Sequence, residues 1–115
     1  MKISGKTIGF AITGSFCTFS KTKEVLKELV NENANIIPIF SYNAYSTDTR
    51  FGKASDFVSY VENLTSNKAI STIAEAEKFG PNNILDILII SPCTGNTLAK
   101  FNNCITDTPV LMAAK

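Results

Sequence analysis

The sequence predicts a parallel α/β fold, and three observations support that prediction. Short apolar runs at residues 7–12, 35–40 and 87–90 alternate with longer stretches of helical periodicity. The run at 87–90 reads ILII, an unbroken apolar segment typical of a strand covered on both faces of a sheet. Hydroxyl or amide residues follow each run, where a strand would end. Strands that alternate with helices in this order favour one parallel sheet.

The first strand is expected at residues 7–12, and a polar turn of Thr13, Gly14 and Ser15 follows it. A helix is expected at residues 20–32, because apolar side chains recur there at the spacing of one helix face and charged side chains occupy the other. The predicted apolar face consists of Val25, Leu26, Leu29 and Val30.

The second strand is expected at residues 35–40, and Ser41 and Asn43 follow its carboxyl end. Pro38 lies inside this strand. Because proline has no backbone N–H, it favours an edge strand or one that is sparsely paired. A short neighbouring strand at residues 69–70 would satisfy that preference.

The segment 44–53 is a long polar loop, and such loops at the ligand edge of a sheet are often functional. A helix is expected after it at residues 54–64. Its predicted apolar face consists of Phe57, Val58, Val61 and Leu64.

A second helix signal starts at Thr72. Thr72 and Glu75 have the spacing of a capping box, which predicts a helix that continues to Phe79. Gly80 and Pro81 are expected to stop it.

The last third of the chain combines a strand, a polar turn and two helices. Pro92 is expected to end the strand at 87–90, and a helix is expected at 98–101 after the turn 94–97. Thr108 and Pro109 have the pattern of an N-cap and a first helical residue. No further strand follows, so we expect one domain over residues 1–115 whose C-terminal strands are missing or are supplied by a partner chain.

Composition excludes several classes of function. The net charge is +1, which is too small to hold a nucleic acid backbone, and no apolar run is long enough for a membrane span or a signal peptide. We therefore expect a cytoplasmic protein that binds neither nucleic acid nor membrane. Three separated cysteines predict neither a disulfide framework nor a zinc site, and we expect reduced, mostly buried thiols and no metal. The absence of histidine excludes Ser-His-Asp catalysis within this chain.

Polar residues follow all three main strands of the predicted sheet. Because the carboxyl ends of parallel strands meet at one edge, these residues are expected to form a ligand site there. A helix N-terminus offers unpaired N–H groups to an anion. The sequence therefore predicts a polar site built from the residues after the strands.

Four segments together resemble a known family. GFAITGSFCTF, STDTRFG, SPCTGNTLAK and TDTPVLMAAK occur in this order, as in the B subunits of dipicolinate synthase. These belong to the wider flavoprotein family, which includes phosphopantothenoylcysteine decarboxylase. The resemblance covers essentially the whole chain, and family members are longer than this one.

The resemblance implies a Rossmann-like three-layer fold and a role in making pyridine-2,6-dicarboxylate for bacterial spores, in the mother cell. The implied reaction is the oxidation of a hydroxylated tetrahydrodipicolinate. NADP would be bound by a partner A subunit, since this chain has no G-x-G-x-x-G motif. A homo-oligomer and flavin mononucleotide (FMN) are also implied.

The resemblance also assigns residues to a site. The phosphate loop of the wider family falls on Gly14 and Ser15, with Ser41 as a further phosphate contact. The turn that meets the flavin ring or the substrate falls on Thr94, Gly95, Asn96 and Thr97. Arg50 and Asn43 are the expected substrate-binding residues, and no catalytic residue is assigned.

Each assignment has a structural alternative. Arg50 is expected to clamp a carboxylate with its guanidinium group, or else to stabilise its loop through Asp48 or Asp56. Asn96 is expected to orient a ligand or to cap a helix. Gly14 and Ser15 could form an ordinary tight turn.

The function also has alternatives. One is a flavin-dependent decarboxylase of the phosphopantothenoylcysteine type. The absence of histidine opposes it, because those enzymes use a histidine and the narrower family usually has one where this chain has Phe16. The other is a non-catalytic partner that stabilises the catalytic subunit.

Overall fold

The computed structural model describes residues 3–14 and 16–115, and its centre is a parallel sheet of three strands. The strands are β1 (Thr7–Ile12), β2 (Asn35–Phe40) and β3 (Ile87–Ile90), in the order β2-β1-β3. All three coincide with the predicted apolar runs. The predicted α/β class with a parallel sheet is therefore confirmed.

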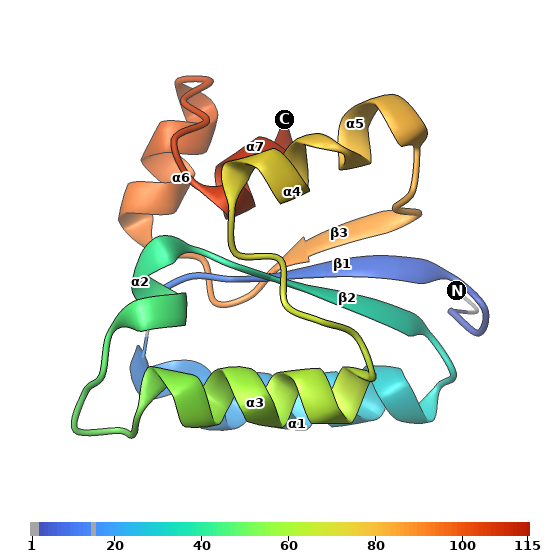
Figure 1. Cartoon of the computed structure of the whole chain (residues 1–115), viewed down its shortest axis with the longest axis vertical. Coiled ribbons are helices and arrows are strands. Elements are labelled where there is room, and N and C mark those ends of the chain that lie inside the picture. The colour runs from blue at the N-terminus through green and yellow to red at the C-terminus, as the bar shows by residue number, and fades with distance from the viewer. Residues whose placement is uncertain (1–2, 15) are drawn as a thin grey trace.

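Helices cover both faces of the sheet, as Figure 1 shows. One face packs against α1 (Phe19–Asn31) and α3 (Ala54–Thr65), and we call it the α1/α3 face. The other face packs mainly against α4 (Ile73–Glu77) and α7 (Pro109–Ala114), and we call it the α4/α7 face. The three layers follow from this arrangement.

The remaining helices are short and lie near the ends of the sheet. A single 3-10 turn, η1 (Phe16–Thr18), leads into α1, and α2 (Tyr42–Ser46) follows β2. The others are α5 (Phe79–Asn82) and α6 (Gly95–Asn102). None of the helices in the described ranges combines the length and the apolar character that a membrane crossing needs.

The register divides the strand residues between the two faces. Ile8 pairs with Ile36 and Ile87, and this row belongs to the core of the α1/α3 face. The adjacent row, one residue further along each strand, lies on the α4/α7 face because side chains alternate along a strand. In β1 that row contributes Gly9, and the next residue on this face is Ala11.

Pro38 is accommodated as its chemistry requires. β2 is an outer strand of the sheet, and on its outer side it forms a parallel bridge between Ile39 and Ile70. The Ile70 N–H donates to the Pro38 carbonyl at 2.8 Å, and the Phe40 N–H donates to the Ile70 carbonyl at 2.9 Å. Pro38 acts here only as an acceptor. The short strand expected at 69–70 is thus reduced to one bridge.

Two helix predictions need correction. Val25 is 40% exposed and does not belong to the buried face of α1, whereas Leu26 is fully buried. Gly80 and Pro81 do not stop the helical path, because they lie inside the separate helix α5. Proline is tolerated there since the first turn of a helix requires no N–H donor.

The residues of β3 and the three cysteines are more exposed than the sequence predicted. All four residues of β3 are only half-buried, because the strand lies at the side of the sheet opposite β2. The three cysteines are free but exposed, contrary to the expectation that they are mostly buried. Cys17 lies in the short turn after β1, and Cys93 and Cys104 lie in the turns after β3 and α6. Few other side chains cover these surface positions.

Candidate functional site

The carboxyl end of β1 is tied to the turn after β3 through one buried hydroxyl. Thr13 is 1% exposed, and its Oγ1 donates to the Pro92 carbonyl oxygen at 2.5 Å. The same oxygen, Thr13 Oγ1, accepts the Thr94 N–H at 3.0 Å. Thr13 thus fixes the position of the turn that begins α6 relative to Gly14.

The carboxyl end of β2 is held against the same point. The Ser41 N–H donates to the Ile12 carbonyl at 3.0 Å. Its Oγ accepts the Ala44 N–H at 3.3 Å, so Ser41 caps α2. A Cβ placed on Gly14 would lie 3.4 Å from the Asn43 Cβ, which brings α2 close to the turn after β1.

The turn after β3 is closed by its own hydroxyl groups. Thr94 Oγ1 accepts the Thr97 N–H at 3.1 Å and donates to Thr97 Oγ1 at 2.9 Å. Thr94 is therefore the N-cap of α6, and the helix begins at Gly95. This corrects the expected start at 98 and removes the capping alternative for Asn96, which lies in the first turn.

These residues lie together at the carboxyl ends of the strands, and we call the group the polar edge: Thr13, Gly14, Ser41, Asn43 and residues 94–97. The expectation that residues after all three strands converge is confirmed by these hydrogen bonds. Gly95 and Asn96 are exposed and occupy helix positions whose N–H groups have no acceptor within the helix. Neutral donors at a helix N-terminus suit an anion such as phosphate.

Two predicted site residues, Ser15 and Arg50, are not part of the polar edge. Ser15 is outside the described residues. Arg50 is exposed, and its guanidinium carbon lies 5.0 Å from the centroid of the Phe51 ring. Within the described ranges it forms no ion pair with Asp48 or Asp56. Asp48 instead accepts the Ala54 N–H at 2.9 Å, at the start of α3.

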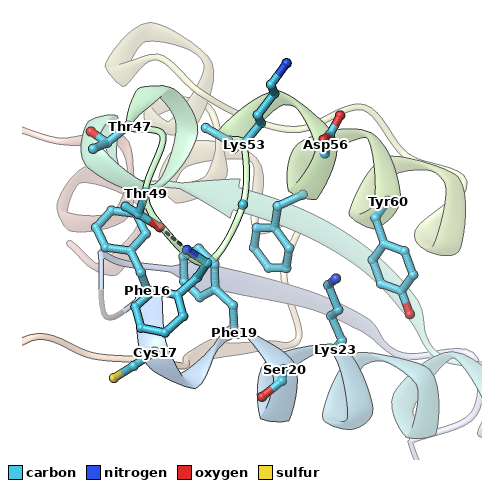
Figure 2. A pocket seen from close by; sticks show the side chains of 14 residues that line it. Phe16, Cys17, Phe19, Ser20, Lys23, Thr47, Thr49, Lys53, Asp56 and Tyr60 are labelled. Atoms are coloured by element: carbon cyan, nitrogen blue, oxygen red, sulfur yellow. Dashed lines mark hydrogen bonds between the residues drawn. The ribbon is translucent and has the colours of Figure 1, made fainter.

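A cleft of about 490 Å³ lies between the start of α1, the loop at 47–53 and α3. We call it the aromatic cleft, since five rings line it together with Lys23, as Figure 2 shows. The rings belong to Phe16, Phe19, Phe51, Phe57 and Tyr60. η1 follows Gly14 after one residue, so the cleft begins beside the polar edge.

The sequence pattern does not predict this cleft. Its rings come from segments that are far apart in the chain, and each Phe taken alone has the pattern of a core or loop residue. One signal was available: Phe16, Phe19 and Lys23 recur at three- and four-residue spacing, which places them along one side of a helical path.

Residues 1–115 match the protein family described as Flavoprotein. The match covers the whole chain, including the polar edge and the aromatic cleft.

A curated relative and a solved structure are similar to the chain over nearly all of its length. The B subunit of dipicolinate synthase from Bacillus subtilis (strain 168) is 47% identical over 113 residues, which are 98% of this chain and 56% of the relative. The crystal structure of the dipicolinate synthase B subunit from Bacillus halodurans has a TM-score of 0.84 and 38% identity. That likeness covers 99% of this chain and 58% of the other. The chain therefore spans a little over half the length of these relatives.

Proposed function

Because this chain belongs to the flavoprotein family, we propose that it acts as the B subunit of a dipicolinate synthase. In this role it supports the oxidation of a hydroxylated tetrahydrodipicolinate to pyridine-2,6-dicarboxylate during sporulation. A nicotinamide-binding A subunit is the partner and binds NADP. The observation that carries the proposal is the 47% identity to the Bacillus subtilis relative over 98% of the chain.

The polar edge supports a flavin with a phosphate group as cofactor, and we propose FMN. Gly14 and Ser41, together with Ser15, would hold the phosphate, and residues 94–97 would contact the ring. The chemistry of the donors fits, because hydroxyl and backbone N–H groups bind phosphate oxygens without a basic side chain. When bound, the flavin would supply two-electron oxidation and reduction.

Ser41 is suited to a phosphate in a specific way. Its oxygen is occupied by the Ala44 N–H, so its own hydroxyl proton remains to be donated to an anion. Thr94 acts differently, because its hydroxyl already donates to Thr97 and accepts from Thr97. Thr94 thus positions the N–H groups of Gly95 and Asn96 and does not itself donate a side-chain proton to a ligand.

The subunit role is tested by co-expressing the full-length chain with the nicotinamide-binding subunit and omitting each in turn. Formation of pyridine-2,6-dicarboxylate is measured with the hydroxylated precursor and NADP. The proposal requires both chains for full activity. If the partner alone works at full rate, this chain is a stabilising module, and release of carbon dioxide from phosphopantothenoylcysteine would instead indicate a decarboxylase.

The flavin is tested by substitutions at Ser41 that keep α2 capped. Aspartate and asparagine are both good N-caps, but only aspartate adds a negative charge beside the phosphate. We expect Ser41→Asp to abolish uptake of FMN and Ser41→Asn to retain it, as measured by the visible absorbance of the repurified protein. Equal uptake by both variants would remove Ser41 from the phosphate site.

Arg50 is proposed to bind a substrate carboxylate, and its lack of an ion pair with Asp48 or Asp56 in the described ranges supports this. We expect Arg50→Ala to weaken binding of pyridine-2,6-dicarboxylate by about 1.5–3 kcal/mol, the scale of a hydrogen bond to a charged group. Titration calorimetry measures it, and Arg50→Lys is the control that keeps the charge. Unchanged affinity in Arg50→Ala would reject the role.

A further inference from the structure

The aromatic cleft has a lining suited to a flat ring. Phe19 and Phe57 stack with their centroids 4.3 Å apart and their planes 12° from parallel. Phe16 meets Phe19 edge to face, at 5.3 Å and 62°. These contacts fix the rings relative to one another before any ligand arrives, which lowers the entropy cost of binding.

Lys23 supplies a cation inside this lining. Its Nζ lies 4.7 Å from the centroid of Tyr60 and 5.7 Å from that of Phe57. Among the described residues it forms no ion pair with a carboxylate. Figure 2 shows its ammonium group pointing up from α1 toward α3, whereas Lys53 points away from the rings. A half-buried cation whose described partners are ring faces favours an anionic ligand.

A second cation stands at the rim of the same cleft. Phe51 lines the cleft and is 56% exposed, and the guanidinium carbon of Arg50 lies 5.0 Å from its ring centroid. Because Phe51 both lines the cleft and contacts Arg50, the Arg50 guanidinium lies beside the cleft that contains Lys23. Among the described lining residues the one acidic side chain, Asp56, lies beside Lys53 at the start of α3.

We propose that the aromatic cleft binds a flat cyclic dicarboxylate, with its ring against the phenylalanines, one carboxylate at Lys23 and the other toward Arg50. This inference rests on the proposed function and deepens it, because it assigns the dicarboxylate to the aromatic cleft and leaves the polar edge to the flavin phosphate. Lys23, Phe51 and Phe57 become substrate-binding residues.

The physical properties of the cleft select this class of ligand. Its volume of about 490 Å³ lies within the range of small-molecule pockets, roughly 300–1,000 Å³. Stacked rings favour a planar partner over a puckered one. Lys23 in the cleft and Arg50 beside it favour a ligand with two carboxylates over a ligand with one, because each carboxylate can then pair with a cation.

The test is titration calorimetry of the full-length chain alone with three ligands in metal-free buffer. Pyridine-2,6-dicarboxylate has both features, pyridine-2-carboxylate lacks one carboxylate, and cis-cyclohexane-1,3-dicarboxylate lacks the flat ring. We expect each of the two analogues to bind at least about tenfold more weakly than pyridine-2,6-dicarboxylate, the scale of one charge-assisted hydrogen bond or one buried ring contact. Equal affinity for all three, or no binding of the first, would overturn the proposal.

Variants assign the site to the cleft. Lys23→Met keeps most of the length of the side chain and removes its charge, so we expect Kd for pyridine-2,6-dicarboxylate to rise about tenfold or more. Lys27→Met is the matched control, because Lys27 is exposed one turn further along α1 and does not line the cleft. Lys23→Arg should restore much of the affinity. A normal Kd in Lys23→Met would overturn the proposal.

The co-expression assay separates this inference from the proposed function. If Lys23→Met leaves both Kd and the KM for the precursor unchanged while the two-subunit enzyme is active, the inference fails and the function stands. If the two subunits make no pyridine-2,6-dicarboxylate, the proposed function fails. The calorimetry of the single chain still decides whether the cleft binds the dicarboxylate.

Discussion

The two faces of the sheet are built differently from the same three strands. β1 directs Ile8, Phe10 and Ile12 to the α1/α3 face, where each is at most 1% exposed. To the α4/α7 face it contributes Thr7, Gly9 and Ala11, none of which is a large apolar residue. The first face is covered by helices of 13 and 12 residues, and the second mainly by helices of five and six.

Because of this difference, the two faces should contribute unequally to the stability of the fold. Large side chains under long helices bury most of the apolar surface on the α1/α3 face, so that face should supply most of the free energy of folding. It also supports the aromatic cleft, because Phe57 belongs both to this core and to the cleft lining. The α4/α7 face is thinner, and next to it α6 leaves Leu98 and Phe101 exposed.

The largest effect should come from a cavity in the α1/α3 face. Phe10→Ala is expected to lower the free energy of unfolding by about 3–5 kcal/mol, because Phe10 is fully buried among large neighbours. Leu88→Ala, on the α4/α7 face, should cost less than half as much since Leu88 is only half-buried. Urea unfolding followed by circular dichroism measures both, and equal losses would contradict the difference between the faces.

A smaller effect should follow from adding one carbon to the α4/α7 face. A Cβ on Gly9 would lie 2.6 Å from Leu85 Cδ1 and 3.0 Å from Leu88 Cδ1. Both are ends of flexible, half-buried side chains that can move, so Gly9→Ala should cost about 1 kcal/mol, at the low end of overpacking.

Gly9→Val is a second, larger substitution for the same unfolding experiment. Its two further methyl groups should cost more than Gly9→Ala, because the Ile39 side chain also lies close, at 3.3 Å from the Cβ position. If Gly9→Ala already costs as much as Phe10→Ala, the α4/α7 face is packed as rigidly as the α1/α3 face.

The smallest effect concerns a carboxylate at the start of α4. A hydrogen bond from the Ser71 N–H, with a further one from the Thr72 hydroxyl, holds the pKa of Glu75 below its ordinary value. Its contribution to stability is therefore fully present above the ordinary glutamate pKa of about 4.3 and is lost as pH falls through the lowered folded-state pKa. Because Glu75 lies near the surface, we expect less than about 0.5 kcal/mol.

Glu75→Gln isolates that contribution. Unfolding midpoints of the wild type and the variant should differ at pH 7 and converge as pH falls below the ordinary glutamate value. Glu62→Gln is a useful comparison, since Glu62 also accepts a backbone N–H, from Ala69 at 2.7 Å. A difference between wild type and Glu75→Gln that grows on acidification would contradict the assignment.

The sequence predicted the strands better than the helix ends. Each apolar run is bounded by polar residues, so the bounds of β1, β2 and β3 followed directly from the pattern. The start of α6 did not, because Thr94 and Asn96 are both good N-caps. The tertiary bond from the Thr94 N–H to Thr13 favours the first. Such a contact between residues 81 positions apart leaves no local signal.

The candidate site likewise has one part that could be predicted from the sequence and one part that could not. Convergence of Gly14, Ser41 and Thr94 could be predicted, because parallel strands end at one edge. The aromatic cleft could not, since it needs the packing of α1 against α3 and the path of the loop at 47–53. The capping box at Thr72 was predicted from its spacing, and Thr72 Oγ1 accepts the Glu75 N–H at 3.2 Å. The Glu75 carboxylate also accepts the N–H of Ser71 at 3.2 Å, a contact that the spacing did not predict.

The polar edge is proposed here as a ligand site, and titration of ¹⁵N-labelled protein with FMN tests that proposal residue by residue. Amide signals of Gly14, Gly95 and Asn96 should shift together and saturate with one dissociation constant. Those of Gly5 and Gly80, which lie away from the edge, should stay in place. Shifts confined to residues outside the edge, or no saturable shift at Gly14 and Gly95, would contradict the claim.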